Sequence, residues 1–380
     1  MNRDRFPALR DGWARLDGPA GSQVVDSAIE AMADWMRSGF NANQGGVFKH
    51  ARESDKVVDS TRAACATLLG GDPAGVAFGP SFTALTMRFA ATVARALEPG
   101  DEIVCTRLDH DSNVRPWVIA AERAGARVRF AEPSPETLEL PASAVEAVLS
   151  ERTRWVAVTA ASNAVGSVPD LPGIIAAAHR RGARVYVDAV HATPHRRNDV
   201  AGLDIDVLGC SAYKRFGPHV GVLCARPEIL EEFRPDKLNP SPEAAPDRWE
   251  LGTLPFEQLA GVRAAAEYML EVDYEALRAH EDALLSAAYE GLSGMEHVTL
   301  YGAAADRAPT LMFNVDGLSS RETATRLAER EIAVWDGNYY AWELEQHLGL
   351  APHGAVRAGF LHYNDAGDAE RLLAAVSELA

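Results

Sequence analysis

The sequence contains little cysteine, and it shows neither a membrane span nor a secretion signal. Its four cysteines, Cys65, Cys105, Cys210 and Cys224, form no CxxC pair and no spacing typical of metal ligands. We expect them to be free, buried apolar residues, because disulfides are uncommon in a chain of this length without a secretion signal. No apolar run is long enough to cross a bilayer, and the N-terminal MNRDRFPALRDGW lacks the apolar core of a signal peptide. These absences predict a cytoplasmic protein.

Net positive charge is also missing. The 37 Lys and Arg residues are outnumbered by 54 Asp and Glu residues, which gives a net charge of -17. Nucleic acids and anionic membrane surfaces bind basic proteins, so we expect neither as a partner. The remaining composition, 47% hydrophobic and 24% charged, is ordinary for a folded chain, and 380 residues are enough for two domains.

Lysine is scarce. Lys49, Lys56, Lys214 and Lys237 are the only lysines, and every other basic residue is arginine or histidine. A guanidinium does not form imines, so chemistry that needs an amine has four candidate side chains. The scarcity narrows that search, but it identifies none of the four by itself.

Short β-branched runs alternate with alanine-rich helical segments from about residue 60 to 225. This alternation predicts an α/β fold with a mostly parallel, seven-stranded sheet flanked by helices. A short Gly-Pro loop separates the last two strands, which favours an antiparallel hairpin at an edge of the sheet. The predicted strands are 75–78, 102–105, 127–130, 155–158, 185–187, 205–208 and 220–223, and the predicted helices are 81–97, 112–124, 141–150 and 171–181.

A proline-rich stretch at 233–247 interrupts this pattern and predicts an exposed excursion. Two long helices follow, at about 256–271 and 274–293, and then a strand–helix–strand pattern. The sequence therefore predicts a smaller α+β domain after the large one. We place an N-terminal segment that packs on the small domain at 1–40, the large domain at 41–255 and the small C-terminal domain at 256–380.

Polar residues follow five of the predicted strands. Ligands of open parallel sheets bind at the carboxyl ends of the strands, so we expect these residues to converge on one crevice. Each of them also has a plain structural explanation, such as capping a helix or forming a turn. The candidates are Ser81, Phe82, Thr83, His110, Asn163, Asp188, His191, Ser211 and Lys214.

The residue types at these positions suit a phosphorylated pyridine cofactor. Free amides at the start of a helix, here residues 81–83, bind phosphate. Asp188 can pair with a protonated pyridine nitrogen and so keep the ring an electron sink. Asn163 and His191 can bond to a ring hydroxyl, and His110 can stack on the ring. A lysine in a mixed polar and aromatic loop, like Lys214, can be partly desolvated, which lowers its pKa and frees the amine for imine formation.

A metal site is a competing interpretation of the same region. Asp188, His191 and His195 have the spacing D-x2-H-x3-H, which would suit ligands on one helix face. Pro194 lies between the two histidines, and the residue before a proline disfavours helix. We therefore predict no metal.

In this order, the segments resemble the class V aminotransferase and cysteine desulfurase family of pyridoxal 5'-phosphate (PLP) enzymes. The resemblance covers nearly the whole chain. The similar segments are LDGPAG at 16–21, DHDSNVRPW at 109–117 (family EHHSNxxPW), SNAVGS at 162–167 (SNxxGT), VDAVH at 187–191 (VDxxQ), SAYKRFGP at 211–218 (SxHKxxGP), ELGT at 250–253 (ExGT), and VRAG with YN at 356–364 (xRxSxxxYN).

The resemblance implies the PLP-dependent transferase fold, PLP as cofactor and a homodimer with shared active sites. It makes Lys214 the Schiff-base lysine and Ser211 a phosphate ligand, and Thr253 would reach the phosphate in the partner subunit. Arg357 would hold the carboxylate of an amino acid substrate. Asn43 and Tyr339 are further candidates for the substrate site. The catalytic residues so implied are Lys214, His110 and Asp188.

Three positions depart from the family pattern. His191 replaces the usual glutamine, Tyr213 replaces a histidine, and no cysteine follows Cys224, although family desulfurases carry one on a loop before the carboxylate-binding arginine. We therefore expect no sulfur transfer through an enzyme persulfide.

The reaction itself remains open. We favour transamination or β-elimination, through an external aldimine and deprotonation of Cα by Lys214. The alternatives are an epimerase, for which His110 or Tyr339 would be the second base, a true cysteine desulfurase, or a non-catalytic metabolite-binding relative.

Overall fold

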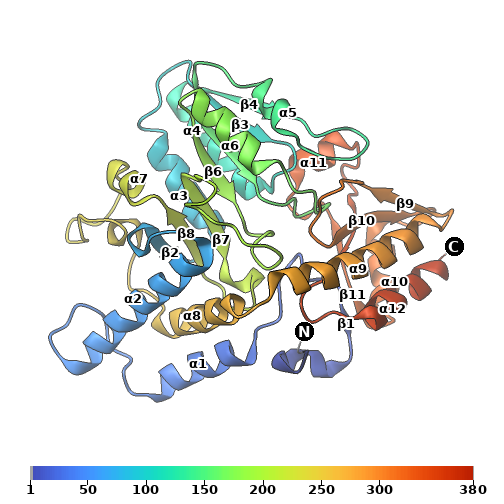
Figure 1. The fold of residues 1–380 in the computed structure, drawn as a ribbon, viewed down its shortest axis with the longest axis horizontal. Helices are drawn as coiled ribbons and strands as arrows, with labels where there is room; N and C mark the ends of the chain where they lie inside the picture. Colours follow the sequence, from blue (N-terminus) through green and yellow to red (C-terminus); the bar gives the residue numbers. More distant parts are fainter. Residues whose placement is uncertain (1–2, 380) are drawn as a thin grey trace.

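The structure is a computed structural model that describes residues 3–379, and Figure 1 shows its fold. Its main sheet has seven strands in the order β2-β8-β7-β6-β5-β3-β4. Five neighbouring strands run parallel, and β8 is antiparallel to both β7 and β2. The predicted sheet is thereby confirmed. The strands are β2 (Val76–Gly79), β3 (Glu102–Thr106), β4 (Arg127–Ala131), β5 (Thr153–Thr159), β6 (Arg184–Asp188), β7 (Val207–Ser211) and β8 (Gly221–Ala225).

Helices cover both faces of this sheet because successive strand residues point to opposite sides. In β5, Val156 and Val158 pack with one layer, whereas Trp155 and Ala157 pack with the other. Both faces are apolar, as a doubly covered sheet requires. The first layer holds α2 (Lys49–Leu69), α5 (Ala142–Glu146), α6 (Leu171–Arg180) and α8 (Phe256–Leu270), and the second holds α3 (Phe82–Val93), α4 (Arg115–Ala124) and α7 (Pro227–Glu232).

The β7–β8 hairpin is antiparallel, as predicted, but its predicted place at the edge of the sheet is wrong. Strand β2 pairs with β8 from Val76↔Cys224 to Gly79↔Gly221 and so forms the edge itself. The two chains approach closely at one end of this pairing, where a Cβ on Gly75 would lie 1.9 Å from the carbonyl oxygen of Ala225. The two strands are far apart in sequence, so no local pattern reveals that they pair.

A second, antiparallel sheet follows in the chain, in the order β12-β13-β10-β9. Its apolar residues pack against α9 and α12 to form a separate core. The elements are α9 (Tyr274–Ser293), β9 (Val298–Tyr301), β10 (Thr310–Val315), α10 (Ser320–Ala328), β11 (Ile332–Ala333), β12 (Trp335–Gly337), α11 (Trp342–His347), β13 (Ala355–Gly359) and α12 (Ala366–Ser377).

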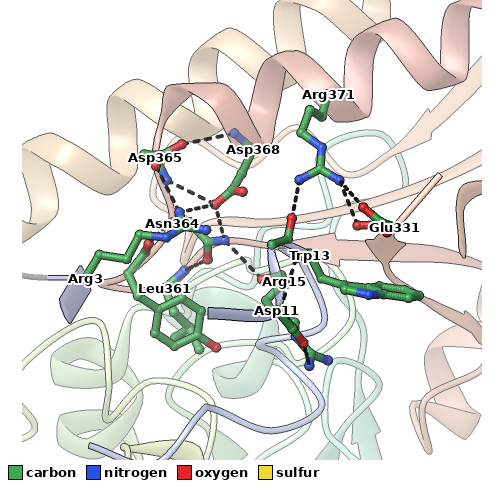
Figure 2. A network of polar contacts seen from close by, with 12 residues as sticks. Arg3, Asp11, Trp13, Arg15, Glu331, Leu361, Asn364, Asp365, Asp368 and Arg371 are labelled. Atoms are coloured by element: carbon green, nitrogen blue, oxygen red, sulfur yellow. Dashed lines mark hydrogen bonds and ion pairs between the residues drawn. The ribbon is translucent and has the colours of Figure 1, made fainter. Parts of the chain in front are cut away.

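The N-terminal residues lie against this second sheet and its helices. β1 (Ala14–Arg15) pairs in parallel with β11. In the polar network of Figure 2, Arg3 Nη1 lies 3.0 Å from Asp368 Oδ2, and Arg371 donates to the Gly12 carbonyl at 2.8 Å. Helix α1 (Asp26–Arg37) packs on α8. The predicted division into an N-terminal segment at 1–40, a large domain at 41–255 and a small domain at 256–380 stays a prediction.

All four cysteines are free and buried, as expected. Across residues 3–379, none of the helices combines the length and the apolar character that crossing a membrane would need.

Candidate active site

The polar strand ends meet in one cavity at the carboxyl edge of the main sheet. A wider cavity of about 580 Å³ adjoins it and shares His110, Asn163 and Lys214 with it. The inner cavity is lined by Ser81, Phe82, Thr83, His110, Asn163, Asp188, His191, Ser211, Tyr213 and Lys214. Residues that line only the outer cavity include Met87, Arg115, Trp335, Tyr339, Tyr340 and Arg357.

Two candidate residues lie outside both cavities. Asn43 is on an exposed segment between α1 and α2. Thr253 lines a separate groove together with Leu251 and Trp249. Neither residue therefore contributes to the site formed by its own chain, and a role for Thr253 requires a second subunit.

Lys214 ends a short 3-10 turn that directly follows β7. Its Nζ donates to the carbonyl oxygen of Pro19. Burial, helped by the positive charge of Arg357, lowers the pKa of the lysine to about 7, and Asp188 opposes the shift. Much of the amine is therefore neutral at neutral pH, which is the nucleophilic form.

Asp188 is the last residue of β6 and is buried. Its Oδ1 accepts a hydrogen bond from the Val190 amide at 2.9 Å. Burial raises the pKa of this carboxyl to about 7, against the effects of that amide and of Lys214. A cationic group placed next to Asp188 would restore its negative charge.

His110 presents a neutral, flat ring to the cavity. Its Nδ1 accepts from the Ser112 amide at 3.0 Å, so the ring proton resides on Nε2. Burial, together with Lys214 and Arg357, lowers the pKa of His110 to about 3. The ring stacks on Tyr340 with centroids 5.4 Å apart. His110 is thus held in place and is not a solvated loop residue.

The first turn of α3 forms the end of the cavity nearest β7. Ser81 caps the helix by accepting from the Ala84 amide at 3.1 Å, and an anion is stabilised at such an end by free amides and the helix dipole. Glycines allow the close packing here. A Cβ on Gly221 would lie 2.3 Å from the carbonyl carbon of Ser81, and one on Gly209 would lie 2.3 Å from the Phe82 ring.

Arg357 projects from β13, so the second sheet supplies the cation of the outer cavity. The side chain is buried, and Nη1 donates to the Asn163 carbonyl at 2.8 Å, while Nε has no partner within residues 3–379. Burial lowers the pKa of the guanidinium to about 10. A carboxylate is the ligand that best satisfies a buried guanidinium with a free donor.

Two consecutive tyrosines hold unusual backbone conformations at the mouth of the cavity. Tyr339 and Tyr340 have φ angles of 52° and 60°, in the left-handed region that side chains disfavour. The Tyr339 ring lies 4.4 Å from the guanidinium of Arg357, and the Tyr340 ring stacks on His110. Such conformations gather at ligand-binding sites, because the surrounding structure has to impose them.

Sequence reasoning missed three supporting residues. Asp109 is buried beside His110, accepts from Asn113 Nδ2 at 2.7 Å and has its pKa raised by burial to about 8. Thr310 Oγ1 lies 2.9 Å from His191 Nε2, and Glu281 lies 3.0 Å from His195. Asp109 stands within a recognised motif, whereas Thr310 and Glu281 carry no local signal.

The side chains considered as metal ligands have other partners. His191 bonds to Thr310 and His195 to Glu281. Within residues 3–379, no three or more His, Cys, Asp or Glu side chains are arranged to hold a metal ion.

Known proteins resemble this chain along nearly its whole length. The profile of the aminotransferase class-V family matches residues 14–372. A protein of Mycobacterium tuberculosis named Uncharacterized protein MT3887 is 33% identical over 99% of this chain and 98% of its own length.

Solved structures share the fold. The cysteine desulfurase CsdA of Escherichia coli superposes with a TM-score of 0.90 at 27% identity, over 99% of this chain and 96% of that one. A C-DES variant, with glycine covalently linked to its PLP cofactor, superposes with a TM-score of 0.83 at 21% identity, over 100% of this chain and 99% of that one. The predicted fold class is confirmed.

Proposed function

The chain belongs to the aminotransferase class-V family, and we propose that it removes the α-proton of an α-amino acid in a transamination or β-elimination reaction. It is a PLP-dependent enzyme, which sets aside a purely metabolite-binding role. One observation carries the proposal. The half-buried Lys214 shares the inner cavity with Asp188 and the outer cavity with Arg357. A base, an anion for the cofactor and a cation for a carboxylate thus surround one space.

The residues of the cavity fit PLP. We assign the cofactor phosphate to the first turn of α3 and to Ser211, and the ring nitrogen to Asp188. We assign the ring hydroxyl to Asn163 and His191. Asn163 Oδ1 supports this assignment, because it is buried and lacks a hydrogen-bond partner within residues 3–379. A polar ligand would satisfy that atom.

PLP, when bound, withdraws electrons from the substrate carbon. Lys214 would hold the cofactor through its amine, and its Nζ, once free, would accept the α-proton of the substrate. Arg357 binds the substrate carboxylate and fixes the orientation of the Cα–H bond. Asp188 keeps its negative charge beside the ring nitrogen, and His110 covers the ring with a neutral imidazole.

Epimerisation requires a second base, and the two candidates are poorly suited. Nδ1 of His110 accepts the Ser112 amide, so its Nε2 already carries a proton. The Tyr339 hydroxyl donates to the Ala355 carbonyl, and burial raises its pKa further. A reaction with Lys214 as the sole base therefore fits better.

Persulfide chemistry is not part of the proposal, although relatives are cysteine desulfurases. The segment beside the outer cavity contributes Trp335, Tyr339 and Tyr340 and no thiol. All four cysteines are buried, and burial raises the pKa of each thiol. None of them is an accessible thiolate, which is the form that attacks sulfur.

Product analysis of amino acids incubated with the purified holoenzyme tests the proposal. Stoichiometric keto acid without ammonia indicates transamination, continuous keto acid with ammonia indicates β-elimination, and a changed enantiomer indicates epimerisation. Exchange of the α-proton with solvent deuterium should stop in Lys214→Ala. Exchange that persists at the wild-type rate in that variant would rule out Lys214 as the base.

We also propose a homodimer with shared active sites. Thr253 lies in a groove with two exposed apolar side chains, Met87 at 42% and Leu251 at 62% exposure. Partner contact would cover these side chains and bring Thr253 to the other subunit's phosphate site. Light scattering should give the mass of a dimer, and Thr253→Ala should weaken PLP binding. A monomer that binds PLP normally would contradict this arrangement.

A further inference from the structure

The structure contains a buried acid–base pair that the proposed reaction does not use. His195 Nδ1 lies 3.0 Å from both carboxylate oxygens of Glu281, and both side chains are only 3% exposed. His195 follows β6, whereas Glu281 lies on α9, so the pair joins the main sheet to the second core. Figure 1 shows α9 extending from the main sheet toward the second sheet. Burying two titratable groups costs free energy, which only their mutual attraction and hydrogen bonds can offset.

The pair lies directly behind the cofactor cavity. The rings of His195 and His191 meet edge to face, with centroids 5.3 Å apart and planes inclined by 68°. His191 lines the inner cavity, and its Nε2 lies 2.9 Å from Thr310 Oγ1. His191 is therefore held on one side by a hydroxyl of β10 and on another by the ring of His195, which leaves Nδ1 for a ligand.

We propose that Glu281 and His195 are a positioning pair that fixes the orientation of His191, and thereby sets the hydrogen bond that His191 makes to the ring hydroxyl of PLP. This inference rests on the proposed assignment of His191 to that hydroxyl. Glu281 accepts a hydrogen bond from the Nδ1–H of His195 and so fixes the orientation of that imidazole. The fixed ring of His195 in turn prevents His191 from rotating away from Thr310 and the cavity.

Other charges also face the pair. Arg196 and His280 face Glu281, and His362, whose Nε2 bonds to the Pro194 carbonyl, faces His195. Burial lowers the pKa of His191 well below its usual value, and His195, Lys214, Arg357 and Arg196 lower it further. His191 is thus neutral, and a neutral imidazole has two tautomers. The Thr310 contact and the orientation imposed by His195 together determine which nitrogen faces the cofactor.

A change in this hydrogen bond should appear in the absorption of bound PLP. A donor at Nδ1 stabilises the anionic ring oxygen, so it lowers the pH at which the bound cofactor loses its proton. Glu281→Gln keeps the shape of the side chain but removes its charge. We expect the midpoint of the absorbance titration to rise by about half a pH unit or more, which is roughly a threefold change in proton affinity. Thr310→Val should shift it in the same direction.

The control uses another ion pair that joins the loop after β6 to the C-terminal part of the chain. Arg196, next to His195, pairs with Asp306 at 3.1 and 3.0 Å. The charge of Arg196 also acts on His191 and Glu281, and Asp306→Asn leaves that charge in place. If Glu281 acts only by holding the two parts together, Asp306→Asn should shift the midpoint as much as Glu281→Gln does. We expect Asp306→Asn to leave it unchanged.

The titration needs no substrate, so it is independent of which reaction the enzyme catalyses, and a failure to bind PLP at all would instead contradict the proposed function. An unchanged midpoint in a folded, PLP-saturated Glu281→Gln protein would overturn the inference, as would an equal shift in Asp306→Asn. If Glu281→Gln fails to fold, Glu281→Asp tests the inference instead. This variant keeps the negative charge, but its shorter side chain no longer reaches His195. An unchanged midpoint in Glu281→Asp would then also overturn the inference.

Discussion

The backbone carbonyl of Asn163 accepts a hydrogen bond of 2.8 Å from the guanidinium of Arg357. Asn163 follows β5 of the main sheet, and Arg357 lies on β13 of the second sheet. A single contact therefore joins the side that we assign to the cofactor to the side that we assign to the substrate carboxylate. β13 also pairs with β10, which carries Thr310. A shift of the second sheet would move Arg357 and the partner of His191 together.

Lys214→Ala is expected to lose covalent attachment of PLP and to slow turnover by about a hundredfold or more, as loss of a general base does. Borohydride reduction followed by mass spectrometry should find the adduct on Lys214 in the wild-type protein and on no lysine in the variant. Lys237, whose Nζ donates to the Ser241 carbonyl at 3.0 Å far from the cavity, gives the control Lys237→Ala. An adduct that remains in Lys214→Ala would disprove the assignment.

Arg357→Lys should raise KM by about tenfold or more, because hydrogen bonds to charged groups contribute about 1.5–3 kcal/mol. A lysine keeps the charge but loses the planar fork that binds a carboxylate through two bonds. Steady-state kinetics with the best amino acid from the substrate screen measures the change. Arg321→Lys is the control, since that side chain is 80% exposed and pairs with Asp336. Equal KM values in the two variants would argue against a carboxylate clamp at Arg357.

The sequence predicts the main sheet and the residues at its carboxyl edge because each of those residues ends a periodic strand or follows one within a few residues. Ser81, His110, Asn163, Asp188 and Lys214 line one cavity for that reason. The sheet edge was mispredicted because β2 and β8 pair across a long stretch of chain.

No local sequence pattern predicts the contacts between the two sheets. Thr310 begins an ordinary apolar strand, and Glu281 is one acidic residue among several on a long helix. Only the packing of α9 and β10 on the loop after β6 brings them to His195 and His191. The left-handed backbone of Tyr339 and Tyr340 is likewise imposed by tertiary contacts, since tyrosine does not favour it.

Reconstitution of the PLP-free protein should become faster as the pH rises through about 7. The pKa of Lys214 is lowered to about 7, so the reactive neutral amine increases across that range and then levels off. Asp188 raises this pKa through its negative charge, and its own pKa is about 7. Asp188→Asn should therefore move the midpoint of the rate profile to lower pH. Stopped-flow absorbance after mixing with PLP measures the rate, and a flat profile in the wild-type protein would contradict a neutral-amine attack.

Gly221→Ala should damage the phosphate end of the cavity more than the rest of the fold. The added Cβ would lie 2.3 Å from the carbonyl carbon of Ser81, which is backbone and cannot rotate away. Relief requires β8 and the first turn of α3 to move apart, and such overpacking costs about 1–3 kcal/mol. The displaced amides of α3 should bind phosphate less well, so we expect weaker PLP binding in addition to a lower free energy of unfolding. Gly294→Ala is the matched control, because its Cβ would meet no atom closer than 3.5 Å and its backbone lies in the right-handed helical region. Equilibrium PLP binding and denaturant unfolding measure the two effects, and unchanged PLP affinity in Gly221→Ala would mean that this turn does not hold the phosphate.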